Sequence, residues 1–153
     1  MALGKGLAVK RNDLMASRLP APQAQAFVAC RKITNDPQTG EIVIVCPVGH
    51  VPITDFPAVI RLAIYAHVTG GHGTYPLAFI LRAADGDAVW RKDAVSPLHH
   101  PDPLMVAQLV FEELRVSVPK PGRYDLALLT GDDEIARQPL LIGPADVLRG
   151  SEA

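Results

Sequence analysis

The stretch AVIRLAIYAHVT, residues 58–69, decides the fold class. Apolar residues occupy its even positions, whereas its odd positions are mixed and include Arg61, Tyr65 and His67. Alternation with a period of two is typical of a strand with one buried face. The β-branched content and the proline and glycines that flank the stretch also favour a strand over a helix. We therefore predict a long strand whose core-facing residues are Ile60, Leu62, Ile64, Ala66 and Val68.

A hairpin is predicted before this strand, and residues 49–57 connect the two. QAFVACRKIT (25–34) and EIVIVCPV (41–48) are two strand-like runs, and NDPQTG (35–40) joins them. Pro37 suits the first central position of a type I turn, and Gly40 suits a left-handed position that closes such a loop.

The hairpin carries both cysteines of the chain, Cys30 and Cys46. Antiparallel partners have residue numbers with a constant sum, here about 76, so the two cysteines are predicted to lie opposite each other or one step off. Free cysteine is among the most buried residue types. We predict two free thiols, adjacent in space and slow to react in the folded protein. A cross-strand disulfide and a redox switch remain as alternatives.

Further strands are predicted after the long strand. TYPLAFILRAA (74–84) and AVWRKD (88–93) are joined by an Asp-Gly-Asp turn. In residues 104–118 apolar residues alternate with other residues, and this alternation changes phase at Glu112-Glu113. The apolar residues occupy odd positions before the change (Met105, Ala107, Leu109 and Phe111) and even positions after it (Leu114, Val116 and Val118). This indicates a β-bulge, and a helix through 106–114 is the alternative.

Two last strands end the pattern, in PKPGRYDLALLTG (119–131) and IARQPLLIG (135–143). The total is about eight strands without long helical runs between them, which disfavours a parallel sheet. The expected fold is all-β, an antiparallel two-sheet β-sandwich with an irregular or partly helical N-terminal arm.

Three parts of the chain are predicted from these boundaries: a basic N-terminal arm (1–22), a sandwich domain (23–143) and a C-terminal tail (144–153). The arm carries four basic residues and one acidic residue, together with leucines that could dock on a partner. The chain has no run of 18 apolar residues and no signal-peptide pattern, so we expect a cytoplasmic protein. Its net charge of −1 gives no general attraction to nucleic acid or anionic lipid.

Residues 24–142 resemble a family of uncharacterised bacterial β-sandwich domains. The resemblance is carried by Cys30 with the Asp36–Gly40 turn, by Phe56-Pro57 before the long strand, and by P-x-P-G-x-Y at Pro119–Tyr124. It implies a sandwich fold and assigns no residue a role. The chain departs from the family pattern at Ile44–Gly49, and the basic arm lies outside the resemblance.

The histidines are the first candidate site. His67, His72 and the pair His99-His100 could approach one another, with Asp102 as an acidic neighbour. Their spacing matches no zinc signature, and adjacent residues of an extended chain point apart. We therefore expect solvent-exposed loop histidines and no stoichiometric zinc.

Other polar groups also lack a catalytic pattern. The serines lie in no nucleophile elbow, and GGHG (70–73) is not followed by the Lys-Ser/Thr of a phosphate loop. Glu112-Glu113 and Asp132-Asp133 are adjacent pairs, which face opposite sides of a strand and make no ready acid/base dyad. Arg82, Arg91 and Lys92 could form a basic stripe with Trp90, although edge protection by the charges and packing of the tryptophan are the simpler interpretation. The serines are Ser17, Ser96, Ser117 and Ser151.

These observations favour a non-catalytic interaction or assembly module, which docks to itself or to a protein partner through its arm, edges or loops. We expect no catalytic residue, cofactor, nucleic-acid partner or membrane partner. A sandwich that binds a small ligand or carbohydrate is the first alternative, which the 5% aromatic content disfavours. A metal-dependent enzyme that uses the loop histidines is the second.

Overall fold

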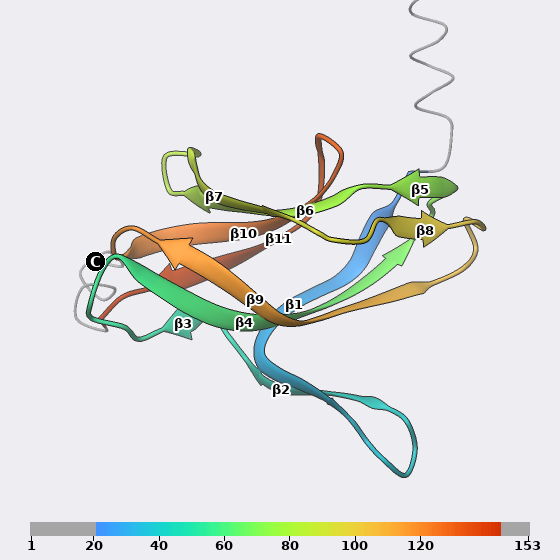
Figure 1. The fold of residues 1–153 in the computed structure, drawn as a ribbon, viewed down its shortest axis with the longest axis horizontal. Helices are drawn as coiled ribbons and strands as arrows, with labels where there is room; N and C mark the ends of the chain where they lie inside the picture. Colours follow the sequence, from blue (N-terminus) through green and yellow to red (C-terminus); the bar gives the residue numbers. More distant parts are fainter. Residues whose placement is uncertain (1–20, 145–153) are drawn as a thin grey trace, which may run out of the picture.

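The computed structural model describes residues 21–144, which form eleven strands and no helix (Figure 1). Residues 21–144 contain no helix that is long and apolar enough to cross a membrane. The strands are β1 (Gln23–Asn35), β2 (Ile42–Pro47), β3 (His50–Val51), β4 (Ala58–Thr69), β5 (Gly73–Tyr75), β6 (Leu77–Ala83), β7 (Ala88–Asp93), β8 (Leu98–His100), β9 (Ala107–Val118), β10 (Gly122–Thr130) and β11 (Asp133–Ile142). The predicted N-terminal arm and C-terminal tail lie outside the described residues, apart from their innermost positions.

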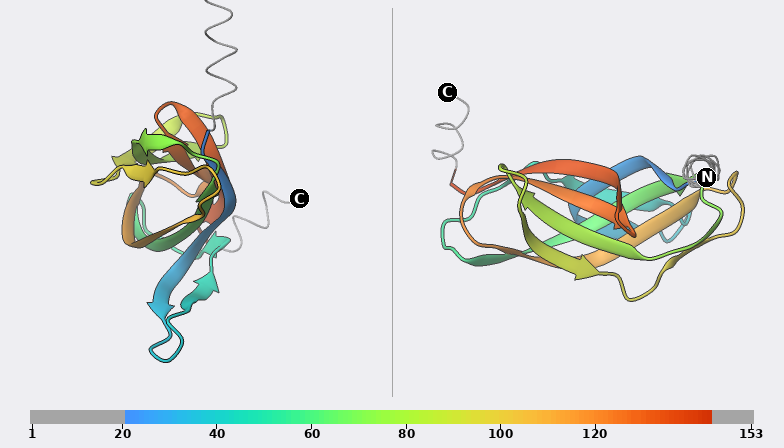
Figure 2. Two further views of the ribbon diagram at one scale, coloured as in Figure 1. Left: turned by 90° about the vertical axis from the view of Figure 1, so that its right-hand side faces the viewer. Right: turned by 90° about the horizontal axis from the view of Figure 1, so that it is seen from above.

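The strands form two packed sheets, as the sequence predicted (Figure 2). The first sheet has the order β2-β1-β4-β9, and the second has the order β3-β11-β10-β6-β7. All pairings are antiparallel except the short parallel contact of β3 with β11. A two-stranded ribbon, β5-β8, lies at one end of the sandwich. The strand count exceeds the predicted eight because β3, β5 and β8, each two or three residues long, lie in segments predicted as connections or as the start of a longer strand.

Strand β4 confirms the predicted core face. Ile60, Leu62, Ile64, Ala66 and Val68 are each at most 5% exposed. Arg61 is exposed, whereas Tyr65 and His67 are half-buried on the opposite face. Ala63, also on that opposite face, is fully buried.

The β-bulge in β9 is confirmed, and the helical alternative for 106–114 is wrong. Leu62 pairs with Leu114 and Ile64 pairs with Phe111, so one residue of β4 faces Glu112 and Glu113. The extra residue reverses the parity of the buried side chains beyond it. The predicted parity fails only at Met105, which precedes the strand and is 39% exposed.

The β1–β2 hairpin leaves the sandwich and projects from it (Figure 2). Strand β1 pairs with β4 as far as Cys30 opposite Ala63, and beyond this point it pairs only with β2. Gln138 of β11 holds the root of the hairpin. Its Oε1 accepts a 2.7 Å hydrogen bond from the Ala29 N–H, and its Nε2 donates to the Val48 carbonyl.

Candidate functional site

The histidines lie in different environments and do not converge. His72 and His99 are exposed, as expected, and His99 Nδ1 lies 3.1 Å from the Thr74 hydroxyl. His67 is half-buried on the outer face of the first sheet, with its ring centroid 5.9 Å from that of Tyr65. Within residues 21–144, no three His, Cys, Asp or Glu side chains lie close enough to hold a metal ion.

His100 corrects the expectation of exposed loop histidines, because it is fully buried. It belongs to β8, which pairs with β5 and covers the end of the core. Its Nε2 lies 2.7 Å from the Met105 carbonyl, whereas its Nδ1 has no hydrogen-bond partner. A Cβ at Gly71 would overlap that Nδ1, so the absence of a side chain at Gly71 makes room for the ring.

The cysteines also correct a prediction. Both are free, but Cys30 is buried and Cys46 is exposed. Cys30 pairs with Pro47, so the pairing sum is 77 and the two cysteines are one step off. Residues one step apart point to opposite faces of a strand pair. The Cys30 thiol lies 3.4 Å from the Ala63 carbonyl, and burial raises the pKa of this thiol above 9.0.

The proposed basic stripe around Trp90 is not assembled. Trp90 and Lys92 pair with the core-facing Leu81 and Phe79, whereas Arg91 pairs with Ile80 on the opposite face. Trp90 packs against the core. The arginines of the outer face are instead engaged in ion pairs, Arg82 with Glu134 at 3.6 Å and Arg91 with Asp93 at 3.0 Å.

The acidic pairs and the serines form no catalytic group in the described residues. Glu113 accepts a 3.3 Å hydrogen bond from Arg115 and lies 3.6 Å from Arg61. Asp132 and Asp133 are exposed where β10 turns into β11. Ser96 and Ser117 are exposed, and Ser17 and Ser151 lie outside the described residues.

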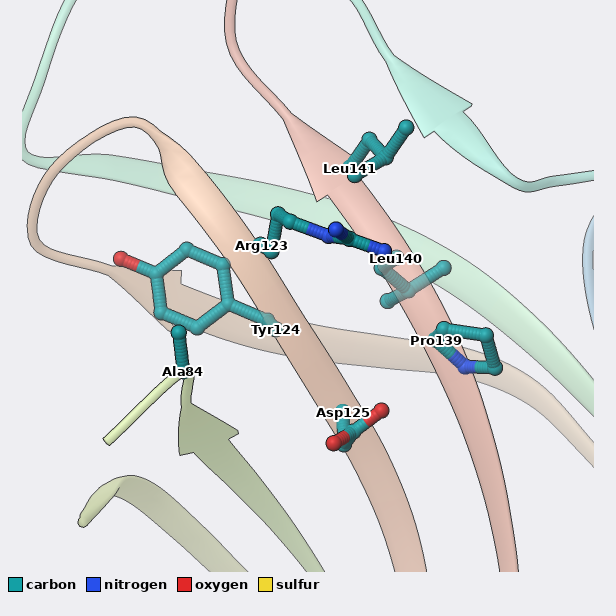
Figure 3. Close-up of a pocket in the computed structure, with 7 residues that line it drawn as sticks. All are labelled: Ala84, Arg123, Tyr124, Asp125, Pro139, Leu140 and Leu141. Carbon is teal, nitrogen blue, oxygen red and sulfur yellow. The ribbon is translucent and has the colours of Figure 1, made fainter. Parts of the chain in front are cut away.

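A depression of about 300 Å³ on the second sheet contains polar groups that serve the structure (Figure 3). The Tyr124 hydroxyl donates a 2.6 Å hydrogen bond to the Lys120 carbonyl, and burial raises the pKa of this hydroxyl above 10.0. Asp125 lies 3.5 Å from Arg137. The lining residues are Ala84, Arg123, Tyr124, Asp125, Pro139, Leu140 and Leu141, and they provide no nucleophile with an adjacent base.

The outer face of the first sheet has a different character, because its central part bears no charged side chain. Val28 pairs with Tyr65, which pairs with Val110, and Ala26 pairs with His67, which pairs with Gln108. Residues opposite one another in a ladder share a face, and these six lie on the face away from the core. We call Ala26, Val28, Tyr65, His67, Gln108 and Val110 the uncharged face. The outer face of the second sheet, by contrast, carries the ion-paired residues Arg82, Arg91, Asp93, Asp125, Glu134 and Arg137.

The projecting hairpin and part of the uncharged face line a common cavity. Ile42 and Ile44 of β2 line a cavity of about 440 Å³ together with Gly40, Glu41, Tyr65 and Gln108. We call this cavity the hairpin cleft. The residues that line it come from segments distant in sequence, so no local pattern predicts it. One feature of the sequence is consistent with a cleft here: Ile42–Val45 are all apolar, so both faces of this strand carry apolar side chains.

The other side of β2 exposes apolar surface. Val43 is 41% exposed and Val45 is 37% exposed. Strand β2 pairs only with β1 among the described strands, so its second edge is unpaired. Unpaired strand edges present free N–H and C=O groups that another strand can bind.

The structure is a β-sandwich domain in which the centre of one outer face bears no charged side chain, although Arg61, Arg115 and Glu113 form ion pairs farther along that face. The chain belongs to a family of unknown function, DUF6941, whose model matches residues 25–143. This confirms the resemblance found in the sequence. No curated protein matches the chain.

Two solved structures share a distant likeness. One is an immunoglobulin-like protein from Pseudomonas aeruginosa, 13% identical, with a TM-score of 0.42, and the match covers 81% of this chain and 98% of that one. The other is a CARDB domain from Pyrococcus furiosus in complex with di-metal ions, 11% identical, with a TM-score of 0.39, and the match covers 82% of this chain and 96% of that one. These values transfer no ligand, activity or residue role.

Proposed function

We propose that this domain is a non-catalytic interaction module that docks a protein partner through the hairpin cleft and the uncharged face beside it. The observation that supports this most is the uncharged centre of the first sheet's outer face, because the ion pairs of that face, which join Arg61 and Arg115 to Glu113, lie beyond it. Charged residues joined by ion pairs lie across the outer face of the second sheet, and such a surface is well suited to solvent. The uncharged face lacks this protection, and cores of protein interfaces are depleted in charged residues in the same way.

The hairpin adds a recognition element to that face. Ile42 and Ile44 line the same cleft as Tyr65, so an inserted partner segment would meet side chains of both the hairpin and the sheet. Tyrosine and aliphatic side chains in a concave setting are common anchors of protein interfaces.

Paired substitutions test this proposal. Tyr65→Lys with Val110→Lys would place two charges on the uncharged face, and Val59→Lys with Val95→Lys would place two charges on valines that are 63% and 97% exposed elsewhere. The immobilised full chain is used to capture partners from an extract of its native cells. We expect the first pair to remove the captured protein and the second pair to retain it, with similar melting temperatures for both. Equal capture by both variants would refute docking at this face.

A second candidate function, binding of a small amphipathic anion, is favoured by one cavity at the open side of the sandwich. The cavity measures about 330 Å³ and is lined by Phe79, Phe111, Lys92 and Glu113, among others. The two phenylalanine rings meet edge to face, with centroids 4.8 Å apart, and Lys92 has no ion pair among the described residues. Titration with medium-chain fatty acids, followed by Trp90 fluorescence, should show saturation that Lys92→Ala weakens. Absence of saturation would exclude this candidate.

A further inference from the structure

We propose that this domain also associates with a second copy of itself, by antiparallel pairing of the free edge of β2 with its symmetry mate. This contact goes beyond the proposed function, because it uses the unpaired edge of β2, whereas the partner proposed above docks at the hairpin cleft and the uncharged face. In this arrangement the two first sheets become one continuous sheet across a two-fold axis near Ile44.

The free edge of β2 is chemically suited to this pairing. The run Ile42-Val43-Ile44-Val45 is uncharged and fully β-branched, and such residues favour strands. Natural edge strands are commonly protected by lysine, proline or a bulge. Here the first four residues of β2 have no such protection, which begins only at Cys46, with a φ of 54°, and Pro47.

Charge complementarity selects an identical strand in the antiparallel direction. Glu41 lies at one end of β2, and Lys32 pairs with Val45 near the other end. Neither Glu41, Arg31 nor Lys32 forms an ion pair among the described residues. A two-fold axis reverses the second strand, so the acidic end of each β2 comes beside the basic end of the other hairpin. A parallel arrangement would bring like charges together, which is unfavourable.

The shape of the molecule permits this approach. The hairpin stands away from the packed sheets (Figure 2), and the outer edge of β2 pairs with no other described strand. An isologous contact of this kind closes after two copies and does not propagate into a fibre.

Charge substitution at the edge provides the test. In a pair centred on Ile44, Val43 of one copy lies opposite Val45 of the other. The double variant Val43→Lys, Val45→Lys therefore places two lysines against two lysines, and Val43→Glu, Val45→Glu does the same with glutamates. Sedimentation velocity of the full chain over a concentration series measures the assembly.

We expect the wild-type chain to form dimers, each double variant to be monomeric or to dimerise at least about tenfold more weakly, and an equimolar mixture of the two variants to form dimers again. The control Val59→Lys, Val95→Lys should dimerise as the wild type does. A wild-type chain that remains monomeric at every concentration, or lysine and glutamate variants that dimerise like the wild type, would overturn the inference. Loss of partner capture in the Tyr65→Lys, Val110→Lys variant alongside a monomeric wild type would reject self-pairing while leaving the proposed function intact.

Discussion

At Cys46 the backbone has a φ of 54°, and the ladder between β1 and β2 omits this position. Positive φ is uncommon for residues other than glycine. The observed pairing sum of 77 places Cys30 and Cys46 on opposite faces, although their separation in sequence suggested contact. A shift of one residue in the strand register therefore decides that the two thiols lie on opposite faces and do not lie side by side.

Native thiol labelling should consequently distinguish the two cysteines. Cys46 is exposed, so it should react with a thiol reagent within seconds to minutes, whereas Cys30 should react only after denaturation. Titration of the folded protein should give one thiol and titration of the denatured protein two. Cys46→Ser should remove the fast thiol, and two fast thiols in the native wild type would contradict the burial of Cys30.

The raised pKa of Cys30 predicts a loss of stability at alkaline pH. The folded state holds the thiol proton more tightly than the unfolded state, so the contribution is complete below pH 9.0 and is lost as pH rises through the folded pKa. The difference in unfolding free energy between the wild type and Cys30→Ala should therefore shrink above that pH. Urea titrations at several pH values measure it, and a difference that grows with pH would contradict the direction of the shift.

Substitution of Leu62 tests which face of β4 packs in the core. It is 3% exposed, so Leu62→Ala should lower the free energy of unfolding by about 2–5 kcal/mol. Val59→Ala, on the same strand at a 63% exposed position, should change it by less than about 0.5 kcal/mol. Chemical denaturation of both variants is the measurement, and a similar small effect at both sites would mean that the face is misassigned.

Single elements carry the features that position the candidate site. The bulge in β9 keeps core side chains inward on both sides of Glu112-Glu113 and was visible in the sequence as a change of parity. The root of the hairpin depends instead on Gln138, whose side chain crosses from β11 to β1. No local pattern marked this glutamine, because its two hydrogen-bond partners are 109 and 90 residues away.

Gln138→Ala should loosen the hairpin. The substitution leaves the Ala29 N–H and the Val48 carbonyl without this side-chain partner, and an unsatisfied buried group costs about 1–3 kcal/mol. We expect a loss of stability in that range and faster amide hydrogen exchange at Ala29. Gln25→Ala, which removes the exposed 3.2 Å hydrogen bond to Thr69, is the control and should have little effect on either quantity. Unchanged exchange at Ala29 would show that Gln138 does not hold the hairpin root.

For the whole molecule, the described sandwich contains its own core, which extends over both sheets. A domain with a complete core should not depend on a terminal segment for stability. Deletion of residues 1–20 should therefore leave the melting temperature within about 2 °C. The deletion stops before Pro22, which is buried.

If residues 1–20 contribute to docking, as their basic and leucine-containing sequence predicts, the deletion should reduce assembly size or partner capture. Unchanged assembly and capture would assign docking to the sandwich alone.

The eight longer strands, the hairpin, the bulge and the sandwich class could be predicted from the sequence, because alternation of apolar and polar residues is a local property of each strand, whereas the short strands β3, β5 and β8 could not. Tertiary structure alone decided the burial of His100, the separation of Cys30 from Cys46, and the hairpin cleft. Each of these depends on register or on distant segments brought together, such as Ile42 and Tyr65, which line one cavity. A period-two pattern states which side chains share a face, but not which strand lies beside it or which outer face remains uncovered.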